Sequence, residues 1–189
     1  MKVALVTGAA RGMGLACARA LGQQGYRIVA NDSNAPDLAA ATQRLRDSGL
    51  DARPIAGDIS SPETLRSIAR ELEAQGGLAA CAHAAGLSSS MASPERILAV
   101  NLAGTARLLD TLLPLANEGT AVVCFASQAA HLWNAIATPK AKQVLDEAQA
   151  PDLAERLAAA IGPASLSSTE AYAWSKLGDV TSDQFRALA

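Results

Sequence analysis

The stretch Val3–Gly14, VALVTGAARGMG, joins an apolar run to a glycine-rich turn. Val3–Val6 does not alternate between apolar and polar residues, which is typical of a parallel strand buried on both faces. The glycines that follow are spaced G-x-x-x-G-x-G, and the residues after them predict a helix that ends at Gly25. A strand, a glycine turn and a helix N-terminus present backbone N–H groups to an anion, and the missing side chains let a phosphate approach. The stretch therefore predicts a phosphate-binding turn.

The next predicted strand, Arg27–Asn31, is followed by an acidic residue in the position that contacts ribose in dinucleotide-binding folds. Asp32 can accept hydrogen bonds from both hydroxyls of an adenosine ribose, and its charge would repel a 2′-phosphate. Ser33 follows, where a 2′-phosphate would favour Arg or Lys, and Arg11 in the turn is the one opposing basic residue. We expect NAD rather than NADP. An ordinary strand–helix turn with a capping Asp is the structural alternative.

The composition predicts one globular domain over residues 1–189. Half of the residues are apolar and 18% are charged, which allows a sizeable core and is unlike a disordered segment. A net charge of −2 with no basic run argues against nucleic acid as a partner. The N-terminus shows no signal-peptide pattern, and no apolar stretch is judged long enough to cross a membrane. We therefore expect a cytoplasmic protein without a membrane partner.

The cysteines and histidines lack the spacing of metal ligands. Cys17, Cys81 and Cys124 are expected to be buried free thiols in a reducing compartment. Neither His83 nor His131 has neighbours in sequence that would complete a metal site. We therefore expect no metal.

Strand and helix patterns alternate beyond the first turn. Helices are predicted at 35–48, 61–75 and from 93 through Asn101 to about 116, and strands at 53–57, 78–82 and 120–126. Proline and glycine mark several of the helix starts and stops. This alternation predicts an α/β fold, a doubly wound parallel sheet of Rossmann-like type with right-handed crossovers.

Two residues near the C-terminal end carry candidate chemistry. Tyr172 and Lys176, in YAWSK, lie four residues apart, so on a helix they project from one face. An ammonium near a phenol favours the phenolate, as does an oxidised nicotinamide, which makes Tyr172 a candidate general base or acid. Ser127 follows the fifth strand, at the carboxyl ends of the strands, where ligands bind in such sheets. It is therefore a candidate to hold a substrate oxygen. An amphipathic surface pair is the alternative for Tyr172 and Lys176.

The motifs occur in the order and context of the short-chain dehydrogenase/reductase family, which this chain resembles along nearly its whole length: TGAARGMG, Asp32, Asp58-Ile59, HAAG, VNLAGT, Ser127 and YAWSK. The resemblance implies hydride transfer between NAD(H) and a secondary alcohol or ketone. It implies a catalytic tetrad of Asn101, Ser127, Tyr172 and Lys176. It implies cofactor binding by Gly8, Arg11, Gly12, Met13, Gly14, Asp32, Asp58, Ile59, Ala84, Gly86, Tyr172 and Lys176.

The resemblance also implies finer roles for some of these residues. In the family, Asp58 and Ile59 would contact the adenine, Lys176 would bind the nicotinamide ribose, and Asn101 would hold a water in a proton relay. The family commonly forms homodimers or homotetramers through the helices that carry Asn101 and Tyr172, so we expect a homo-oligomer.

Two features depart from the family pattern. His83 stands where an Asn usually braces the sheet, and we expect it to make a structural hydrogen bond. The segment between Ser127 and Tyr172 is long, with an insert at about 133–168 that contains helices predicted at 138–150 and 151–161. This insert resembles that of bacterial 3α-hydroxysteroid dehydrogenase/carbonyl reductases, which implies a bulky alicyclic or aromatic ketone. A packing or interface role is the open alternative.

The end of the chain departs as well. Leu177–Thr181 is expected to interrupt the helix, because Gly, Val and Thr are poor helix formers. No sixth strand or substrate lid is recognisable, so we expect an exposed fifth strand and a missing C-terminal substrate-binding part. We also expect that the sequence omits segments after Gly178, which the intact mass tests. A non-catalytic dinucleotide-binding protein is therefore the alternative function.

Overall fold

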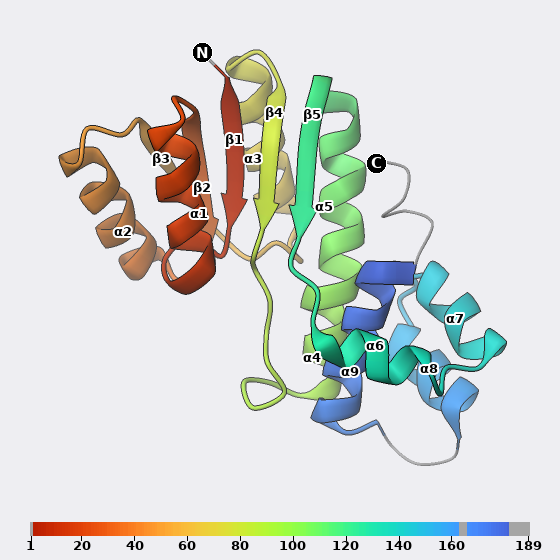
Figure 1. The fold of residues 1–189 in the computed structure, drawn as a ribbon. Helices are drawn as coiled ribbons and strands as arrows, with labels where there is room; N and C mark the ends of the chain where they lie inside the picture. The colour runs from red at the N-terminus through yellow and green to blue at the C-terminus, as the bar shows by residue number, and fades with distance from the viewer. Residues whose placement is uncertain (1, 163–165, 182–189) are drawn as a thin grey trace. The chain divides into compact units, whose positions relative to one another are not determined.

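The computed structural model describes residues 2–162 and 166–181 (Figure 1). The chain divides into two units. Unit 1 comprises Met1–Ala85 and Asp110–Phe125, and unit 2 comprises Gly86–Leu109 and Ala126–Ala189.

A parallel sheet of five strands forms the centre of unit 1, in the order β3-β2-β1-β4-β5. The chain moves outward from β1 to β3 and then crosses to the other side of β1, so the strand order reverses between β1 and β4. Ligands bind at such a reversal, beyond the carboxyl ends of the strands. The doubly wound α/β fold is confirmed. The strands are β1 (Val3–Thr7), β2 (Arg27–Asp32), β3 (Ala52–Ala56), β4 (Leu78–His83) and β5 (Ala116–Cys124).

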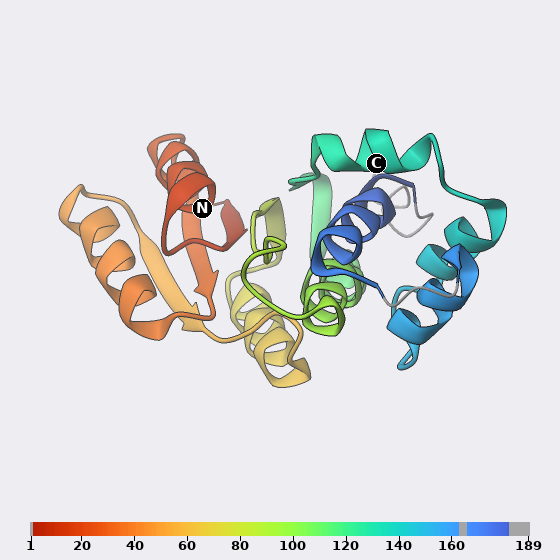
Figure 2. The ribbon, with the colours of Figure 1, turned by 90° about the horizontal axis from the view of Figure 1, so that it is seen from below.

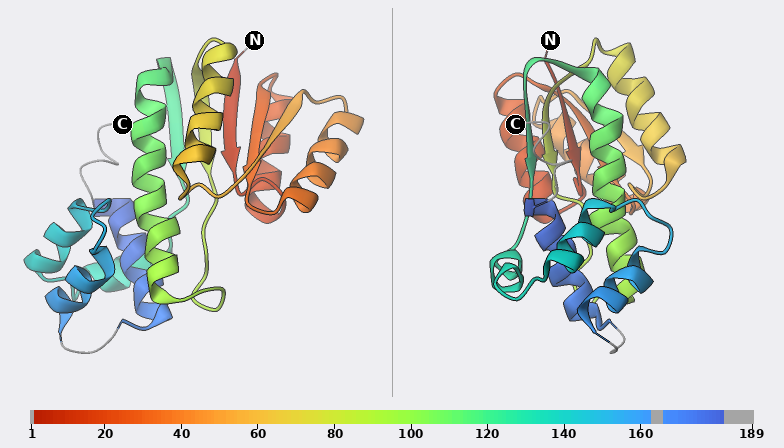
Figure 3. Two further views of the ribbon diagram at one scale, coloured as in Figure 1. Left: turned by 180° about the vertical axis from the view of Figure 1, so that it is seen from behind. Right: turned by 90° about the vertical axis from the view of Figure 1, so that its right-hand side faces the viewer.

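Three helices connect the first four strands: α1 (Gly12–Gln23), α2 (Ala35–Asp47) and α3 (Pro62–Ala74). The views from the front and from behind show α1 and α3 on opposite faces of the sheet (Figures 1 and 3). The apolar strand residues are buried between them, which explains why β1 has no alternation. Seen from below, the carboxyl ends of the strands face the viewer (Figure 2).

β5 forms one edge of the sheet that the described residues make, as expected. It begins at Ala116, earlier than predicted, and its pairing with β4 shifts register between Leu78 and Ala80. Val123 is 55% exposed on this strand. An apolar edge of this kind is unusual for a sheet that ends in solvent.

The predicted long helix after β4 is confirmed, with one irregularity. It consists of α4 (Pro94–Leu98), a π-helical segment η1 (Ala99–Gly104) and α5 (Thr105–Leu112), followed by a 3-10 turn (Leu113–Leu115). The π-helical segment contains Asn101. Segments of this type are rare and often occur at functional sites.

The run Pro94–Leu115 could cross a membrane if only its length and composition are considered, because its mean hydropathy is 1.2. This differs from the expectation that no stretch reaches that length. Within the structure, however, 67% of its most apolar window is buried. Packing against the rest of the chain accounts for that composition.

Three helices follow Ser127: α6 (Gln128–Asn134), which precedes most of the insert, and α7 (Pro139–Asp146) and α8 (Leu153–Ile161), which lie within it. The two predicted helices are confirmed as α7 and α8, but α7 ends at Asp146 instead of about residue 150. Lys140 and Lys142 at its start and Asp146 at its end oppose the helix dipole, which is consistent with a short helix. α6 was not predicted, and it carries His131.

The apolar faces of α7 and α8 are buried in the core of unit 2, beside α4 and the last helix, α9 (Ser168–Thr181) (Figure 3). The packing therefore occupies the apolar faces of both helices. This finding favours the packing role for the insert. The buried residues of these faces are Ala141, Val144, Leu145, Leu153 and Leu157, and Ala148 between the two helices is buried with them.

α9 continues through Gly178 to Thr181, so the predicted interruption is wrong. A Cβ at Gly178 would lie 2.4 Å from Cδ1 of the buried Leu102, and its absence lets α9 approach η1 closely. Tertiary packing at this contact outweighs the low helix propensity of glycine. The predicted omission of later segments lies outside the described residues.

Candidate active site

The glycine turn after β1 is built from backbone packed too closely for side chains. A Cβ at Gly14 would lie 2.1 Å from the carbonyl oxygen of Gly8. A Cβ at Gly8 would lie 2.8 Å from the backbone nitrogen of Ala85, and Gly8 has φ +65°. Gly12 has φ +54°, and nothing lies within 4 Å of the place of its Cβ. The turn is therefore tight on its inner side and open at Gly12.

The N-terminus of α1 is not capped by a side chain. Its N-cap residue, Arg11, is extended and makes no side-chain cap hydrogen bond, and the first turn holds no acidic residue. By contrast, α2, α3 and α4 each have a side-chain cap and an acidic residue in the first turn. The N–H groups at the start of α1 are thus left for an external anion. Arg11 and Met13 beside them are exposed.

Asp32, at the end of β2, is tied to the glycine turn. Its Oδ2 accepts a hydrogen bond from the Ala10 N–H at 3.1 Å, and its Oδ1 accepts one from the Asn34 N–H at 3.0 Å. These contacts fix the carboxylate next to the turn, where the ribose role requires it. In the same unit, Asp58 accepts hydrogen bonds from the N–H and hydroxyl of Ser60, and Ile59 is buried.

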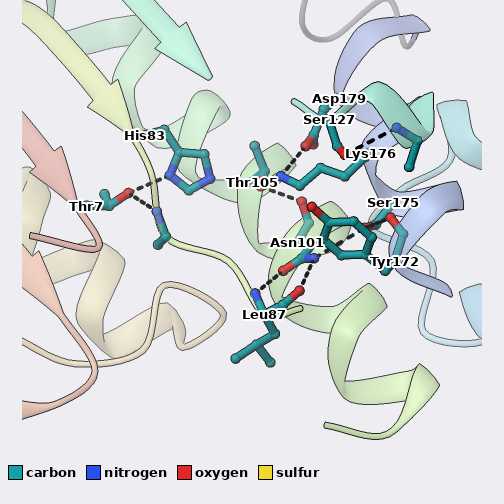
Figure 4. A network of polar contacts seen from close by, with 12 residues as sticks. Thr7, His83, Leu87, Asn101, Thr105, Ser127, Tyr172, Ser175, Lys176 and Asp179 are labelled. Atoms are coloured by element: carbon teal, nitrogen blue, oxygen red, sulfur yellow. Dashed lines mark hydrogen bonds and ion pairs between the residues drawn. The ribbon is translucent and has the colours of Figure 1, made fainter. Parts of the chain in front are cut away.

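His83 makes a structural contact, as predicted. Its Nδ1 lies 2.6 Å from the hydroxyl oxygen of Thr7, which also accepts a hydrogen bond from the Ala85 N–H at 3.1 Å (Figure 4). Both side chains are buried. The pair joins β1 to β4 and fixes the segment that carries Ala84.

Asn101 is fully buried, and its amide holds the loop that precedes α4. Its Oδ1 accepts from the Leu87 N–H at 2.7 Å, and its Nδ2 donates to the Leu87 carbonyl at 2.9 Å and to the Ser175 hydroxyl at 3.3 Å (Figure 4). Its own carbonyl accepts the Thr105 hydroxyl at 2.6 Å. The side chain thus links the loop to α9, while its place in a proton relay stays a prediction.

The structure places all four predicted catalytic residues in unit 2. Ser127 is half-buried at the N-cap of α6, where its Oγ accepts from the Ala129 N–H at 3.2 Å. Tyr172 is half-buried and Lys176 is buried on α9, against which α6 packs. Figure 4 shows both side chains on this helix, as the spacing of four residues predicts.

Asp179 is a site residue that the sequence analysis missed. Its Oδ2 lies 2.8 Å from Nζ of Lys176, and both side chains are buried. Burial raises the pKa of Asp179 to about 6, although the charge of Lys176 and its hydrogen bond lower it. The residue was overlooked because Leu177–Thr181 was not expected to be helical. On a continuous helix, a spacing of three from Lys176 would have indicated the pair.

This pKa predicts how Asp179 affects stability. A carboxyl whose pKa is higher in the folded state favours folding below its unfolded pKa near 3.9, and that contribution is lost as the pH rises through about 6. We expect Asp179→Asn to become more stable relative to the parent protein by about 2 kcal/mol between pH 4 and pH 7. Urea unfolding of both proteins at several pH values measures this, because other carboxyls cancel in the difference. A difference that does not vary with pH would contradict the raised pKa.

No disulfide joins any of the three cysteines, all of which the structure describes. Burial, with a smaller effect from Cys124, raises the pKa of the Cys81 thiol far above its usual range, so Cys81 is not a reactive thiolate. Within the described residues, no group of three or more His, Cys, Asp or Glu side chains is arranged to hold a metal ion.

Comparison with known proteins gives one family. The family model described as short chain dehydrogenase matches residues 2–139. A short-chain dehydrogenase/reductase from Pestalotiopsis microspora is 29% identical over 141 residues, covering 70% of this chain and 53% of that protein. D-threitol dehydrogenase from Mycolicibacterium smegmatis is 34% identical over 139 residues, covering 68% of this chain and 54% of that protein. This chain thus spans about half the length of these relatives.

Solved structures give the same fold. A variant of actinorhodin polyketide ketoreductase crystallised with NADPH superposes with a TM-score of 0.67 at 21% identity, covering 94% of this chain and 60% of that one. RhlG of Pseudomonas aeruginosa, in a complex with NADP, has a TM-score of 0.58 at 27% identity and covers 68% of this chain and 54% of that one. The resemblance of the insert to hydroxysteroid dehydrogenases is not confirmed by these comparisons.

Proposed function

Because the chain belongs to the short-chain dehydrogenase/reductase family, we propose that it is an NAD(H)-dependent oxidoreductase that interconverts a secondary alcohol and a ketone. The observation that carries the proposal is the uncapped start of α1 behind a glycine turn. The proposal assigns dinucleotide binding to unit 1 and proton exchange to α9 of unit 2.

The residues of unit 1 fit a dinucleotide. Gly8 and Gly14 keep the turn tight, and the open side of Gly12 and the free N–H groups of α1 suit a pyrophosphate. Asp32 is fixed beside the turn to accept the ribose hydroxyls. A bound reduced nicotinamide supplies the hydride for the carbonyl carbon.

Unit 2 supplies the groups for the proton. In the direction of reduction, the Tyr172 hydroxyl donates its proton to the ketone oxygen as the carbonyl carbon is reduced. The Ser127 oxygen accepts a backbone N–H, which uses one of its lone pairs and leaves its O–H to donate to the substrate oxygen. The Lys176 ammonium lies on the same helix face as Tyr172 and stabilises the phenolate that the proton transfer leaves.

We propose NAD over NADP because of Asp32 and Ser33, although two solved structures of the same fold contain NADPH and NADP. Asp32→Ala should weaken NADH binding by about 10-fold to 100-fold, since it removes charged hydrogen bonds, and weaken NADPH binding less. Fluorescence titration with both nucleotides measures the ratio. The control is Asp47→Ala, which removes the same charge at the exposed end of α2. Tighter binding of NADPH than of NADH by the parent protein would contradict the preference.

The substrate is proposed only as a class. A ketone panel that contains steroid-like, alicyclic and aromatic members, offered with NADH and with NADPH, tests both the class and the insert analogy. The competing function is a dinucleotide-binding protein without turnover, and the panel separates the two.

We also propose that the protein forms a homodimer or homotetramer, as the family commonly does.

A further inference from the structure

We propose that Asp179 is a positioning residue that holds the Lys176 ammonium and moderates its effect on the Tyr172 hydroxyl. This inference rests on the proposed function, because it concerns the proton-donating group of that reaction. It assigns a role to a side chain outside the predicted tetrad.

The three residues form one stripe along α9. Tyr172, Lys176 and Asp179 lie at positions i, i+4 and i+7, which fall on the same face of a helix with 3.6 residues per turn. Lys176 is therefore the central member, with the phenol one turn before it and the carboxylate about one turn after it. Figure 4 shows the paired Lys176 and Asp179 side chains.

The contact between Lys176 and Asp179 is a buried ion pair. The side chains are 11% and 2% exposed, and Nζ lies 2.8 Å from Oδ2. A buried ammonium is strongly destabilised without a counter-charge, and at this distance the carboxylate fixes where that charge sits. Asp179 therefore fixes the position of the Lys176 charge from the C-terminal side of Lys176, whereas Tyr172 lies on its N-terminal side along α9.

The second oxygen of Asp179 argues against a purely structural role. Its Oδ1 is buried and has no hydrogen-bond partner among the described residues. Buried polar atoms are nearly always paired, and an unpaired one calls for an explanation. The ion pair with Lys176 accounts for Oδ2 alone and leaves the burial of Oδ1 uncompensated.

The electrostatic consequence has a definite sign. A positive charge near a phenol stabilises the phenolate, and a carboxylate paired with that charge opposes the effect. Lys176 is the charged group that acts on Asp179 within the described residues. The other ionisable groups on the helices packed against α9 are at exposed or half-exposed positions, and none of them bonds to Asp179: Glu95, Arg96, His131, Lys140, Lys142 and Asp146.

Because the chain has two tyrosines, the phenol of Tyr172 can be observed by itself. In a Tyr26→Phe background, the ultraviolet absorbance of tyrosinate is followed against pH without cofactor, over the range in which circular dichroism stays native. Asp179→Asn should lower the midpoint of this titration by about one pH unit. Asp179→Leu removes the same charge and provides a second variant if the first does not fold. Glu155→Gln, an exposed carboxylate on α8, is the control and should leave the midpoint unchanged.

An unchanged or higher midpoint in a folded Asp179 variant would overturn the inference. Lys176→Met separates this failure from failure of the proposed function. If Lys176→Met raises the midpoint but the Asp179 variants do not lower it, the role of Lys176 stands and that of Asp179 falls. If no variant moves the midpoint, the acid–base role of Tyr172 falls with it. The high-pH limb of kcat/KM should move in parallel with the absorbance, which a merely structural residue would not cause.

Discussion

Tyr172→Phe should lower kcat for ketone reduction by about 10²-fold to 10⁴-fold while leaving dinucleotide binding nearly unchanged. The substitution removes one oxygen, and with it the proton that the reduced ketone must receive. The half-buried ring stays in place against the core of unit 2, so the fold should persist. Steady-state rates and fluorescence titration with NADH measure the two effects.

The control is Tyr26→Phe, because it removes the same atom from the other tyrosine, in unit 1. It should keep both rate and binding. If Tyr172→Phe turned over ketones at the parent rate, another group would supply the proton, and the assignment of α9 to proton exchange would be wrong.

Gly14→Ala should have the largest effect on dinucleotide binding. The added Cβ would lie 2.1 Å from the Gly8 carbonyl oxygen, an atom of the backbone that cannot rotate away. The turn would have to open, which should destabilise the fold by about 1–3 kcal/mol and weaken NADH binding by more than about 100-fold. Urea unfolding and NADH titration measure the two quantities.

Gly22→Ala is the matched control, because it makes the same change on the same helix. There the nearest atoms belong to the side chain of Leu50, which can shift, and alanine is favoured over glycine in a helix by about 1 kcal/mol. This variant should bind NADH like the parent protein and be no less stable. Normal binding by a folded Gly14→Ala protein would mean that the glycine turn does not hold the nucleotide.

The sequence predicted the part of the fold that local signals encode. The unbroken apolar run of β1, the glycine spacing and the prolines near the starts of α2 and α3 each specify an element without reference to the rest of the chain. The spacing of Tyr172 and Lys176 likewise gave their common helix face. The alternation of these elements was then sufficient to predict the doubly wound sheet.

Other features depend on packing between distant segments and could not be derived locally. Gly178 is helical because its missing side chain fits Leu102, 76 positions earlier, and this contact has no local signature. The π-helical turn around Asn101 and the short helix α6 were missed for the same reason. Asp179 was missed as a consequence, since its pairing with Lys176 requires α9 to continue.

The most direct test of the account follows a deuterium atom. The protein is given NADH deuterated at the transferred position together with the ketone panel, and the products are analysed by mass spectrometry. The proposed function predicts an alcohol that carries the deuterium on its carbinol carbon, formed by the parent protein and not by Tyr172→Phe. Tight binding of NADH with no labelled alcohol from any ketone would contradict it and would identify a dinucleotide-binding protein without turnover.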